Sequence, residues 1–322
     1  MSAEDWRPTA SAEALRGRAA VLRRIRDFFH ARGVTEVETP AVAAATVPDL
    51  HLAGPTVRLP RLTGEREWYL QTSPEYAMKR LLAAGSGPVF QLGKAFRDGE
   101  AGARHNPEFT LLEWYRPGWD HHRLMDEVEE LLCEILGTVA SDRVTYAELF
   151  RRELGVDPWL ATVADLTAVA GRAGIEVAGT PPNDADTWLQ LLLAERLEPR
   201  LGHDRPFFLY DFPPSQAALA RIRPGDPPVA ERFEVYGRGV ELANGYHELT
   251  DAAEQRRRFE LDRAERRRRG LPSVELDERF LAALEHGLPP CAGVALGVDR
   301  LVMLALGASR LDEVLAFPLD RA

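Results

Sequence analysis

Residues 90–116 read FQLGKAFRDGEAGARHNPEFTLLEWYR, and this stretch decides the fold class. Its two ends, residues 89–96 and 109–115, are rich in aromatic and β-branched side chains and predict two neighbouring strands. The segment between them is highly charged and longer than a hairpin turn requires. It contains Gly99 and Gly102, which let a backbone approach a ligand closely. Charged loops on rigid strands often bind ligands, although a solvated hairpin tip is the simpler interpretation for an arbitrary loop.

The residue pattern of this stretch, F-R-x6-R-H-N-P-E-F-T-x-x-E-x-Y, resembles motif 2 of class II aminoacyl-tRNA synthetases, in the form carried by lysyl-tRNA synthetases. The resemblance implies an α/β (α+β) fold with a mostly antiparallel sheet flanked by helices. It also implies that Arg97 stabilises the α-phosphate of ATP and that Phe109 stacks on adenine. The remaining ATP contacts expected in this motif are Asp98, Gly99, Glu100, His105 and Asn106.

Two further stretches support this interpretation. Residues 12–33 have the apolar spacing of a helix and precede VTEVETPAV, and together, over about 12–42, they resemble motif 1, through which class II synthetases form homodimers. CAGVALGVDRLVMLALG, at about 291–307, resembles motif 3, in which Gly297 would let ATP approach the sheet and Arg300 would lie on the γ-phosphate. Either stretch alone would be weak, because glycine-rich strand–helix junctions are common.

The segment T-S-P-E ahead of motif 2 predicts a helix start, with Ser73 as cap, Pro74 in the first position and Glu75 in the first turn. Most such tripeptides do nothing else. The lysyl-type resemblance places these three residues at the amino-acid pocket, which also includes Glu113, Tyr115 and Ala295. An acidic lining suits a substrate with two ammonium groups, because a neutral amino acid would leave buried carboxylates unpaired at a cost of about a few kcal/mol.

A second acidic pattern, VELANGYHELTDAAEQ, contains Glu241 and Glu248 on either side of an Asn–Gly pair. We expect this pair to form a turn that folds the two carboxylates back toward one another. Surface ion pairing is the usual role of such residues, but Mg²⁺ also prefers carboxylate oxygens. The resemblance implies that Glu241 and Leu242 lie at ATP and its metal. It also implies that Glu248 binds the distal amine of the substrate, and the remaining pocket residues are Asn244 and Tyr246.

The rest of the chain predicts helices and turns but no catalytic or binding residues. Residues 154–201 read as a helical insertion with helices at about 163–173 and 186–197. Residues 236–239 indicate a hairpin turn. The arginine-rich segment 255–269 is typical of a solvated helix face, with a docking surface as the less common alternative.

Composition excludes several classes of protein. The 322 residues are 45% hydrophobic and 28% charged, which is ordinary for a globular protein. Forty basic against fifty acidic residues give a net charge of −10, which argues against stable nucleic-acid binding outside a local basic patch. Two cysteines, Cys133 and Cys291, are too few for a disulfide framework and lack metal-ligand spacing. No run of residues is long and apolar enough to span a membrane. We therefore expect a cytoplasmic protein.

The whole chain reads as a single catalytic domain over residues 1–322, and motif 1 begins too early to leave room for an anticodon-binding domain. Over its length it resembles the elongation factor P–lysine ligase family, in which Ala replaces the usual lysyl-synthetase Gly at Ala295. The resemblance implies that ATP and Mg²⁺ activate lysine or (R)-β-lysine, and that the acceptor is a lysine side chain of elongation factor P. Two alternatives stay open: a minimal lysyl-type enzyme that charges tRNA, and an inactive paralogue that acts as a binding subunit. Asp98–Gly99 stands where the family usually has Asn–Glu, which favours the inactive alternative slightly.

Overall fold

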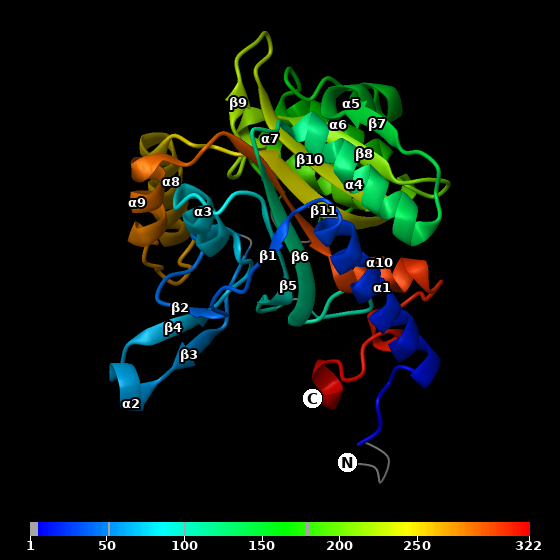
Figure 1. The fold of residues 1–322 in the computed structure, drawn as a ribbon. Coiled ribbons are helices and arrows are strands. Elements are labelled where there is room, and N and C mark those ends of the chain that lie inside the picture. Colours follow the sequence, from blue (N-terminus) through cyan, green and yellow to red (C-terminus); the bar gives the residue numbers. More distant parts are fainter. Residues whose placement is uncertain (1–5, 51, 100, 178, 180) are drawn as a thin grey trace. The chain divides into compact units, whose positions relative to one another are not determined.

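The structure is a computed structural model that describes residues 6–50, 52–99, 101–177, 179 and 181–322 (Figure 1). The chain forms two compact units. Unit 1 comprises Met1–Gly118 and Thr250–Ala322, and unit 2 comprises Trp119–Leu249. Each unit combines helices with mostly antiparallel strands, as expected from the motif 2 resemblance. Their assignment to one catalytic domain stays a prediction.

Unit 1 carries the two strands predicted around motif 2. The strands of its larger sheet lie in the order β1 (Thr35–Glu36), β5 (Val89–Phe96), β6 (Glu108–Pro117) and β12 (Cys291–Gly297). The β1–β5 pair is parallel, and β5–β6 and β6–β12 are antiparallel. A small antiparallel sheet has the order β2 (Val42–Ala43), β4 (Glu67–Leu70) and β3 (Thr56–Arg58).

The helices of unit 1 are α1 (Ala12–His30), α2 (Pro60–Thr63), α3 (Glu75–Ala83), α8 (Ala252–Arg268), α9 (Glu278–Gly287) and α10 (Val298–Ala305), with 3₁₀ turns at Leu311–Glu313 and Leu319–Arg321. Helix α1 covers one face of the sheet, because Phe29 stacks on Phe90 of β5 and meets Trp114 of β6 edge-on. Helix α10 lies beside α1 (Figure 1). The predicted helix 12–33 is thus confirmed, although it ends at His30.

Unit 2 has the strand order β11 (Val240–His247), β10 (Val229–Gly237), β8 (Phe207–Phe212) and β7 (Asp142–Thr145), with β9 (Ile222–Arg223) paired to β10. Its helices are α4 (His121–Leu136), α5 (Tyr146–Leu154), α6 (Val163–Arg172) and α7 (Ala185–Leu192), followed by a π-helical turn at Leu193–Leu197 and 3₁₀ turns at Glu198–Arg200 and Pro214–Gln216. The two predicted insertion helices are confirmed within a few residues. They pack on a core that includes Tyr146, Phe150 and Trp188.

The predicted β10–β11 hairpin is confirmed. Its two central residues, Arg238 and Gly239, have φ values of 50° and 69°, as a two-residue turn with both residues in the left-handed region requires. Glycine is also needed at 239 for space, because a Cβ there would lie 2.9 Å from the carbonyl oxygen of Pro199.

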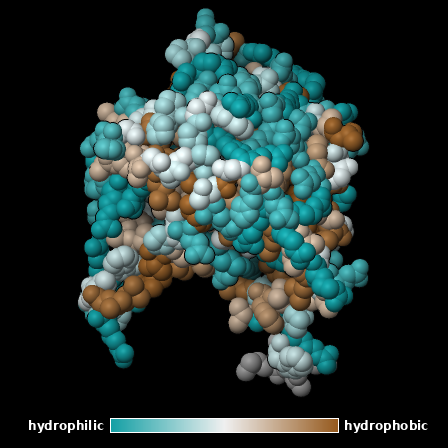
Figure 2. All heavy atoms as spheres, viewed as in Figure 1, coloured by the Kyte–Doolittle hydropathy of each residue, from teal (hydrophilic) through white to brown (hydrophobic). Residues whose placement is uncertain are grey.

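The charged helix α8 is mostly a solvated face, as its sequence predicts. Four arginines at its two ends, Arg257, Arg258, Arg268 and Arg269, pair with Glu254 or Glu265 one turn away. Arg266 is the exception, because it is buried and donates to the backbone oxygens of Asp49 and Pro272. The face of the molecule in Figure 2 is largely hydrophilic, in keeping with this charge distribution. Within the described residues, every helix is too short or too polar to cross a bilayer.

Candidate active site

Motif 2 presents two faces with different chemistry. Strand side chains alternate between faces, so Phe109, Glu113 and Tyr115 of β6 share one face, while Trp114 faces α1. Strand β12 pairs with β6 so that Ala295 lies directly opposite Glu113. Opposite residues in a sheet place their side chains on the same face. The Ala295 side chain of motif 3 therefore lies next to Glu113 on the same face of the sheet.

Glu113 is the centre of a buried polar cluster in unit 1. Ser73 Oγ donates to Glu113 Oε2 at 2.6 Å, and Tyr115 Oη donates to Glu113 Oε1 at 2.7 Å. Burial and the nearby Glu75 carboxylate raise the pKa of Glu113 to about 7, against the lowering effect of the two hydrogen bonds and Lys79. Near neutral pH this carboxyl therefore exchanges between its neutral and ionised forms. The structure brings together the predicted Ser73, Glu75, Glu113, Tyr115 and Ala295.

Gln91 belongs to this cluster and was not predicted. It lies on β5 directly opposite Glu113, on the side away from Ala295, and it is buried. Its side-chain oxygen Oε1 is buried without a hydrogen-bond partner among the described residues. Buried acceptors in proteins are normally paired, so this oxygen is positioned to accept a hydrogen bond from a ligand. Strand alternation could have placed Gln91 on this face, but only the β5–β6 register places it beside Glu113.

The acidic lining expected from the sequence is partly neutralised. Lys79, which is 1% exposed, lies 2.5 Å from Glu75 Oε1 through its Nζ atom. The four-residue spacing on α3 is the signal that could have identified this pair. The structure also shifts the helix start by one residue, because Pro74 is the N-cap of α3 while Ser73 Oγ still accepts the Glu75 N–H at 3.0 Å.

Arg97 lies where β5 ends and the motif 2 loop begins. Its guanidinium carbon lies 5.0 Å from the centre of the Phe109 ring, in cation–π geometry. Its backbone N–H donates to the Pro107 carbonyl at 2.9 Å, which closes the base of the loop. The two residues expected at the α-phosphate and at adenine are thus neighbours.

Arg300, in the first turn of α10, reaches the other end of the same loop. Its Nη2 lies 2.6 Å from Nε2 of His105, and its Nε donates to the Arg104 carbonyl. A guanidinium can only donate, so His105 Nε2 is the acceptor of this contact. Gly297 ends β12 and caps α10, opposite Leu111 of β6.

The second half of the loop also contacts the C-terminal segment. Asn106 accepts the backbone N–H of Leu319 at 3.0 Å and donates to the Glu108 carbonyl at 2.6 Å. The backbone N–H of Leu311 donates to the Ala103 carbonyl. Asn106, predicted near ATP, therefore has a structural role in this conformation.

Asp98 and Gly99, which depart from the family pattern, lie at a turn in the backbone. Gly99 has a φ of 83°, which side-chain-bearing residues rarely adopt, and the Asp98 N–H donates to the Ala53 carbonyl at 2.8 Å. The chain therefore turns tightly at Gly99. Glu100, predicted at ATP, lies outside the described residues.

A buried ionic cluster links the three motifs of unit 1. Arg18 of α1 lies 2.6 Å from Asp299 Oδ1 and donates to Thr110 Oγ1 at 2.8 Å, while Asp299 Oδ2 accepts the Thr110 N–H at 2.9 Å. The apolar spacing of residues 12–33 places Arg18 on the outward face of the helix and so predicts a solvated side chain. This prediction is wrong, because the side chain is only 14% exposed. Asp299 precedes Arg300 and so fixes the start of α10 against β6.

In unit 2, β11 is one continuous strand. The expected turn at Asn244–Gly245 is wrong, because these residues pair with Glu234 and Phe233 of β10. The β10–β11 ladder continues on both sides of the pair and favours extended backbone over the local turn preference of Asn–Gly. Glu241 and Glu248 are thus seven residues apart on extended backbone, a chain length of about 23 Å at roughly 3.3 Å per residue. They do not face one another across a turn, and the joint Mg²⁺ site stays a prediction.

The predicted residues of β11 nevertheless share a face. Asn244 and Tyr246 lie opposite Glu234 and Arg232 of β10, and Glu241 lies opposite Tyr236. These three β10 residues share one face of the strand. A one-residue bulge at Leu242 puts the Glu241 side chain on the same face as Asn244 and Tyr246. Asn244 Nδ2 donates to Tyr246 Oη at 3.1 Å, and Asn244 Oδ1 accepts from Arg232. Leu242 itself is buried, as is Glu248, which follows the strand and bridges to Ala220.

Comparison with known proteins agrees with this architecture. The family described as class II tRNA synthetases (D, K and N) matches residues 2–321. The chain belongs to this family. An elongation factor P–(R)-β-lysine ligase of Vibrio cholerae serotype O1 is 53% identical over 324 residues, covering 100% of both chains. The ligases of the same name from Hamiltonella defensa and Vibrio vulnificus are 52% and 54% identical, with 99% and 98% of both chains covered.

The resemblance drawn from the three motifs is confirmed by these matches. Within the class II synthetases the chain belongs to the elongation factor P–(R)-β-lysine ligase family, and ATP use follows from the family. The roles of individual residues stay predictions.

Proposed function

We propose that this chain is an ATP-dependent ligase that activates (R)-β-lysine, or lysine, as an aminoacyl-adenylate and transfers it to a lysine side chain of elongation factor P. Family membership and the names of the relatives support this proposal. The motif residues of unit 1 share one face or meet at the ends of the motif 2 loop, which also supports it.

The proposal rests on two neighbouring acceptors, Glu113 and Gln91, which lie directly opposite one another on β6 and β5. Glu113 is a buried carboxyl with a pKa of about 7, and Gln91 presents a buried side-chain oxygen without a partner among the described residues. An ammonium group would supply both with hydrogen bonds and would favour the ionised form of Glu113. An apolar group of the same size would leave Gln91 Oε1 unpaired, at a cost of about 1–3 kcal/mol. The pocket thus selects an amine-bearing substrate.

The reaction has two steps. A carboxylate oxygen of the amino acid attacks the α-phosphorus of ATP, and the bond to pyrophosphate breaks. The acceptor amine, having lost a proton, then attacks the carbonyl carbon of the adenylate, an amide forms, and AMP leaves. Both steps depend on positioning and charge neutralisation.

The chain has cations at the two ends of the motif 2 loop for this purpose. Arg97, next to Phe109, would hold the α-phosphate, and Arg300, next to His105, would hold the pyrophosphate. A guanidinium suits both because its fork binds two phosphate oxygens at once.

Mg²⁺ fits the carboxylate chemistry of Glu241, a partly exposed hard donor on the polar face of β11. When bound with ATP, the ion would neutralise phosphate charge. Glu248 would bind the distal amine of the substrate, and Asn244 and Tyr246 would line the same face of β11.

Ala295 is the specificity residue in this proposal. Its methyl group stands opposite Glu113, where a glycine would leave more room. Moving the amino group from the α to the β carbon shifts it by about 1.5 Å, which is comparable to the length of a carbon–carbon bond. We propose that the extra methyl favours the β-isomer. A cytoplasmic homodimer formed through the motif 1 segment belongs to the same proposal, and sedimentation of the full chain tests the dimer.

Parallel transfer assays test the function. Labelled lysine and labelled (R)-β-lysine are incubated with ATP, the full chain and either elongation factor P or bulk tRNA, alongside ATP–pyrophosphate exchange. We expect label on elongation factor P, stronger with the β-isomer, and none on a factor whose acceptor lysine is replaced by arginine. Label on tRNA alone would establish the synthetase alternative. Absence of both transfer and exchange would establish the inactive paralogue.

A further inference from the structure

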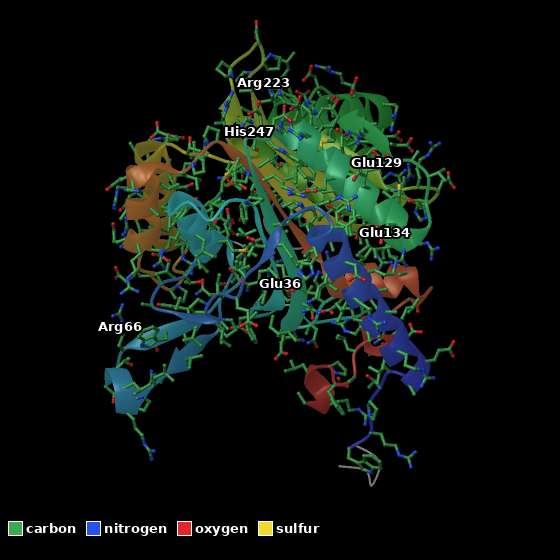
Figure 3. The ribbon with its side chains drawn as sticks, in the orientation of Figure 1. Glu36, Arg66, Glu129, Glu134, Arg223 and His247 are labelled. Carbon is green, nitrogen blue, oxygen red and sulfur yellow. The ribbon has the colours of Figure 1, made fainter. Side chains whose placement is uncertain are left out.

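Unit 2 carries a second cluster of chemistry-bearing side chains, on the face of β10 and β11 opposite the one that holds Glu241. Glu231 and His247 follow the Arg232–Tyr246 pair in register, one residue further along each strand, and so occupy the other face. His121, the first residue of α4, meets them there. Figure 3 labels His247 near Arg223, which lies on the neighbouring strand β9.

The ligand atoms of this cluster lie close enough together to hold one metal ion. One ligand atom from each of His121, Glu231 and His247 lies within 4.8 Å of the others. Glu231 Oε2 lies 2.8 Å from His247 Nδ1. The side chains are 1%, 7% and 13% exposed, respectively. Three donors at this separation can contact one central ion at about 2.0–2.2 Å after small side-chain adjustments.

Unpaired buried atoms point to a missing partner. Both ring nitrogens of His121 are buried without a hydrogen bond among the described residues. Glu231 Oε2 and His247 Nδ1 are buried beside them and contact each other at 2.8 Å. A buried imidazole with two unpaired nitrogens is costly, because buried polar groups normally find partners. A bound cation would supply the partner that the protein does not.

A carboxylate stands behind the cluster. Asp211 of β8 has Oδ1 3.7 Å from His121 Nε2, and Arg223 donates to its Oδ2 at 2.6 Å. Ligating imidazoles usually direct their second nitrogen at such a carboxylate, which orients the ring. Asp211 is therefore placed to orient His121.

A purely ionic cluster is the competing interpretation. Arg221 Nε lies 3.3 Å from Glu231 Oε2, and Arg223 Nη1 lies 3.5 Å from Glu231 Oε1. These contacts neutralise Glu231, but they leave both nitrogens of His121 unpaired. The two arginine side chains are 52% and 38% exposed, so either can turn toward solvent when a cation enters.

We propose that His121, Glu231 and His247 form a binding site for a divalent transition-metal ion, with Zn²⁺ as the best match to two imidazoles and one carboxylate. The ion joins the start of α4 to β10 and β11. Because His247 immediately precedes Glu248, the site fixes the end of the strand from which Glu248 projects. The site is separate from the Mg²⁺ proposed at Glu241.

Zinc binding by the tag-free, chelator-stripped full chain tests the proposal. Zn²⁺ is titrated in competition with a chromophoric chelator, and Co²⁺ is added separately to record visible d–d absorption. The variants are His121→Gln, His247→Gln and Asp211→Asn. The matched control is His122→Gln, the adjacent histidine on α4, whose ring also lies against His121 but is not one of the three ligands. All variants keep Cys133 and Cys291, so the thiols contribute equally throughout.

We expect one tightly bound Zn²⁺ per wild-type chain and unchanged binding in His122→Gln. Loss of either histidine ligand should weaken binding about 100-fold, and Asp211→Asn about tenfold, in line with the effect of an orienting group. If His121→Gln fails to fold, Glu231→Gln, which keeps the side-chain shape, gives the same test. No Zn²⁺ binding by the wild type, or equal binding by the ligand variants, would overturn the proposal and leave an ionic cluster.

Discussion

Replacing Glu113 with glutamine tests whether this buried carboxyl binds the substrate ammonium. Its pKa is about 7 because burial and Glu75 disfavour the charged form, whereas an ammonium ligand requires that form. With a pKa near 7, the ionised fraction rises from about 9% at pH 6 to about 91% at pH 8. The affinity of the wild type for lysine should therefore rise about tenfold over this range. The glutamine variant should bind weakly and without this pH dependence.

The raised pKa of Glu113 also makes the free energy of unfolding depend on pH. The sign of this dependence is opposite to that of an ion-paired carboxylate with a lowered pKa. Between pH 4.5, the ordinary value, and about 7, folded Glu113 holds a proton that the unfolded chain has released. The free energy of unfolding therefore falls as pH rises through this window, by at most about 3 kcal/mol. Glu113→Gln removes this loss. Relative to the wild type, it should gain stability as pH rises from 5 to 8.

Isothermal titration with lysine at pH 6, 7 and 8, at constant ionic strength, measures the first effect, and denaturant unfolding at pH 5 and 8 measures the second. Glu108→Gln is the matched control, because Glu108 lies on the same strand but is 54% exposed and pairs with Lys94. A wild-type affinity that is flat with pH, or a Glu113→Gln profile parallel to the wild type, would refute the reasoning.

Three other predictions concern unit 1 and β11. Arg97→Ala and Glu248→Ala should each abolish ATP–pyrophosphate exchange with an unchanged circular dichroism spectrum, and wild-type exchange in either would contradict the site assignment. Arg18→Met should lower the free energy of unfolding by about 3 kcal/mol, since it leaves Asp299 buried without its cation. Arg16→Met, at an exposed position of the same helix, should change it by less than about 0.5 kcal/mol, and equal denaturation midpoints for the two would show that the cluster contributes nothing. Gly99→Ala should raise the KM for ATP, because a φ of 83° costs a side-chain-bearing residue about 1–2 kcal/mol. Gly102→Ala should leave this KM unchanged, because Gly102 lies outside the left-handed region and has open space around its Cβ. Equal KM values for the two variants would exclude this explanation.

The amino-acid sequence by itself determined the elements and most of the motif residues. Periodicity and capping operate over a few residues, so the strands around motif 2, the insertion helices and the Arg238–Gly239 turn were all predictable. Alternation along β6 also placed Glu113 and Tyr115 on one face. The family could be predicted for the same reason, because its motifs are contiguous in the chain.

Local preference failed where a longer-range interaction was stronger. The turn preference of Asn244–Gly245 is outweighed by backbone pairing with β10, so β11 runs straight through it. The amphipathic pattern of α1 predicted a solvated Arg18, but a buried carboxylate 281 positions further along the chain binds it instead.

Only the tertiary structure decided which side chains meet. Gln91 stands beside Glu113 because of the β5–β6 register, and Ala295 stands on its other side because β12, far along the chain, pairs with β6. His121, Glu231 and His247 gather across more than a hundred residues of sequence through α4 and two strands. Register and packing depend on the free energy of the whole folded chain, and the local patterns that specify helices, strands and turns do not contain that information.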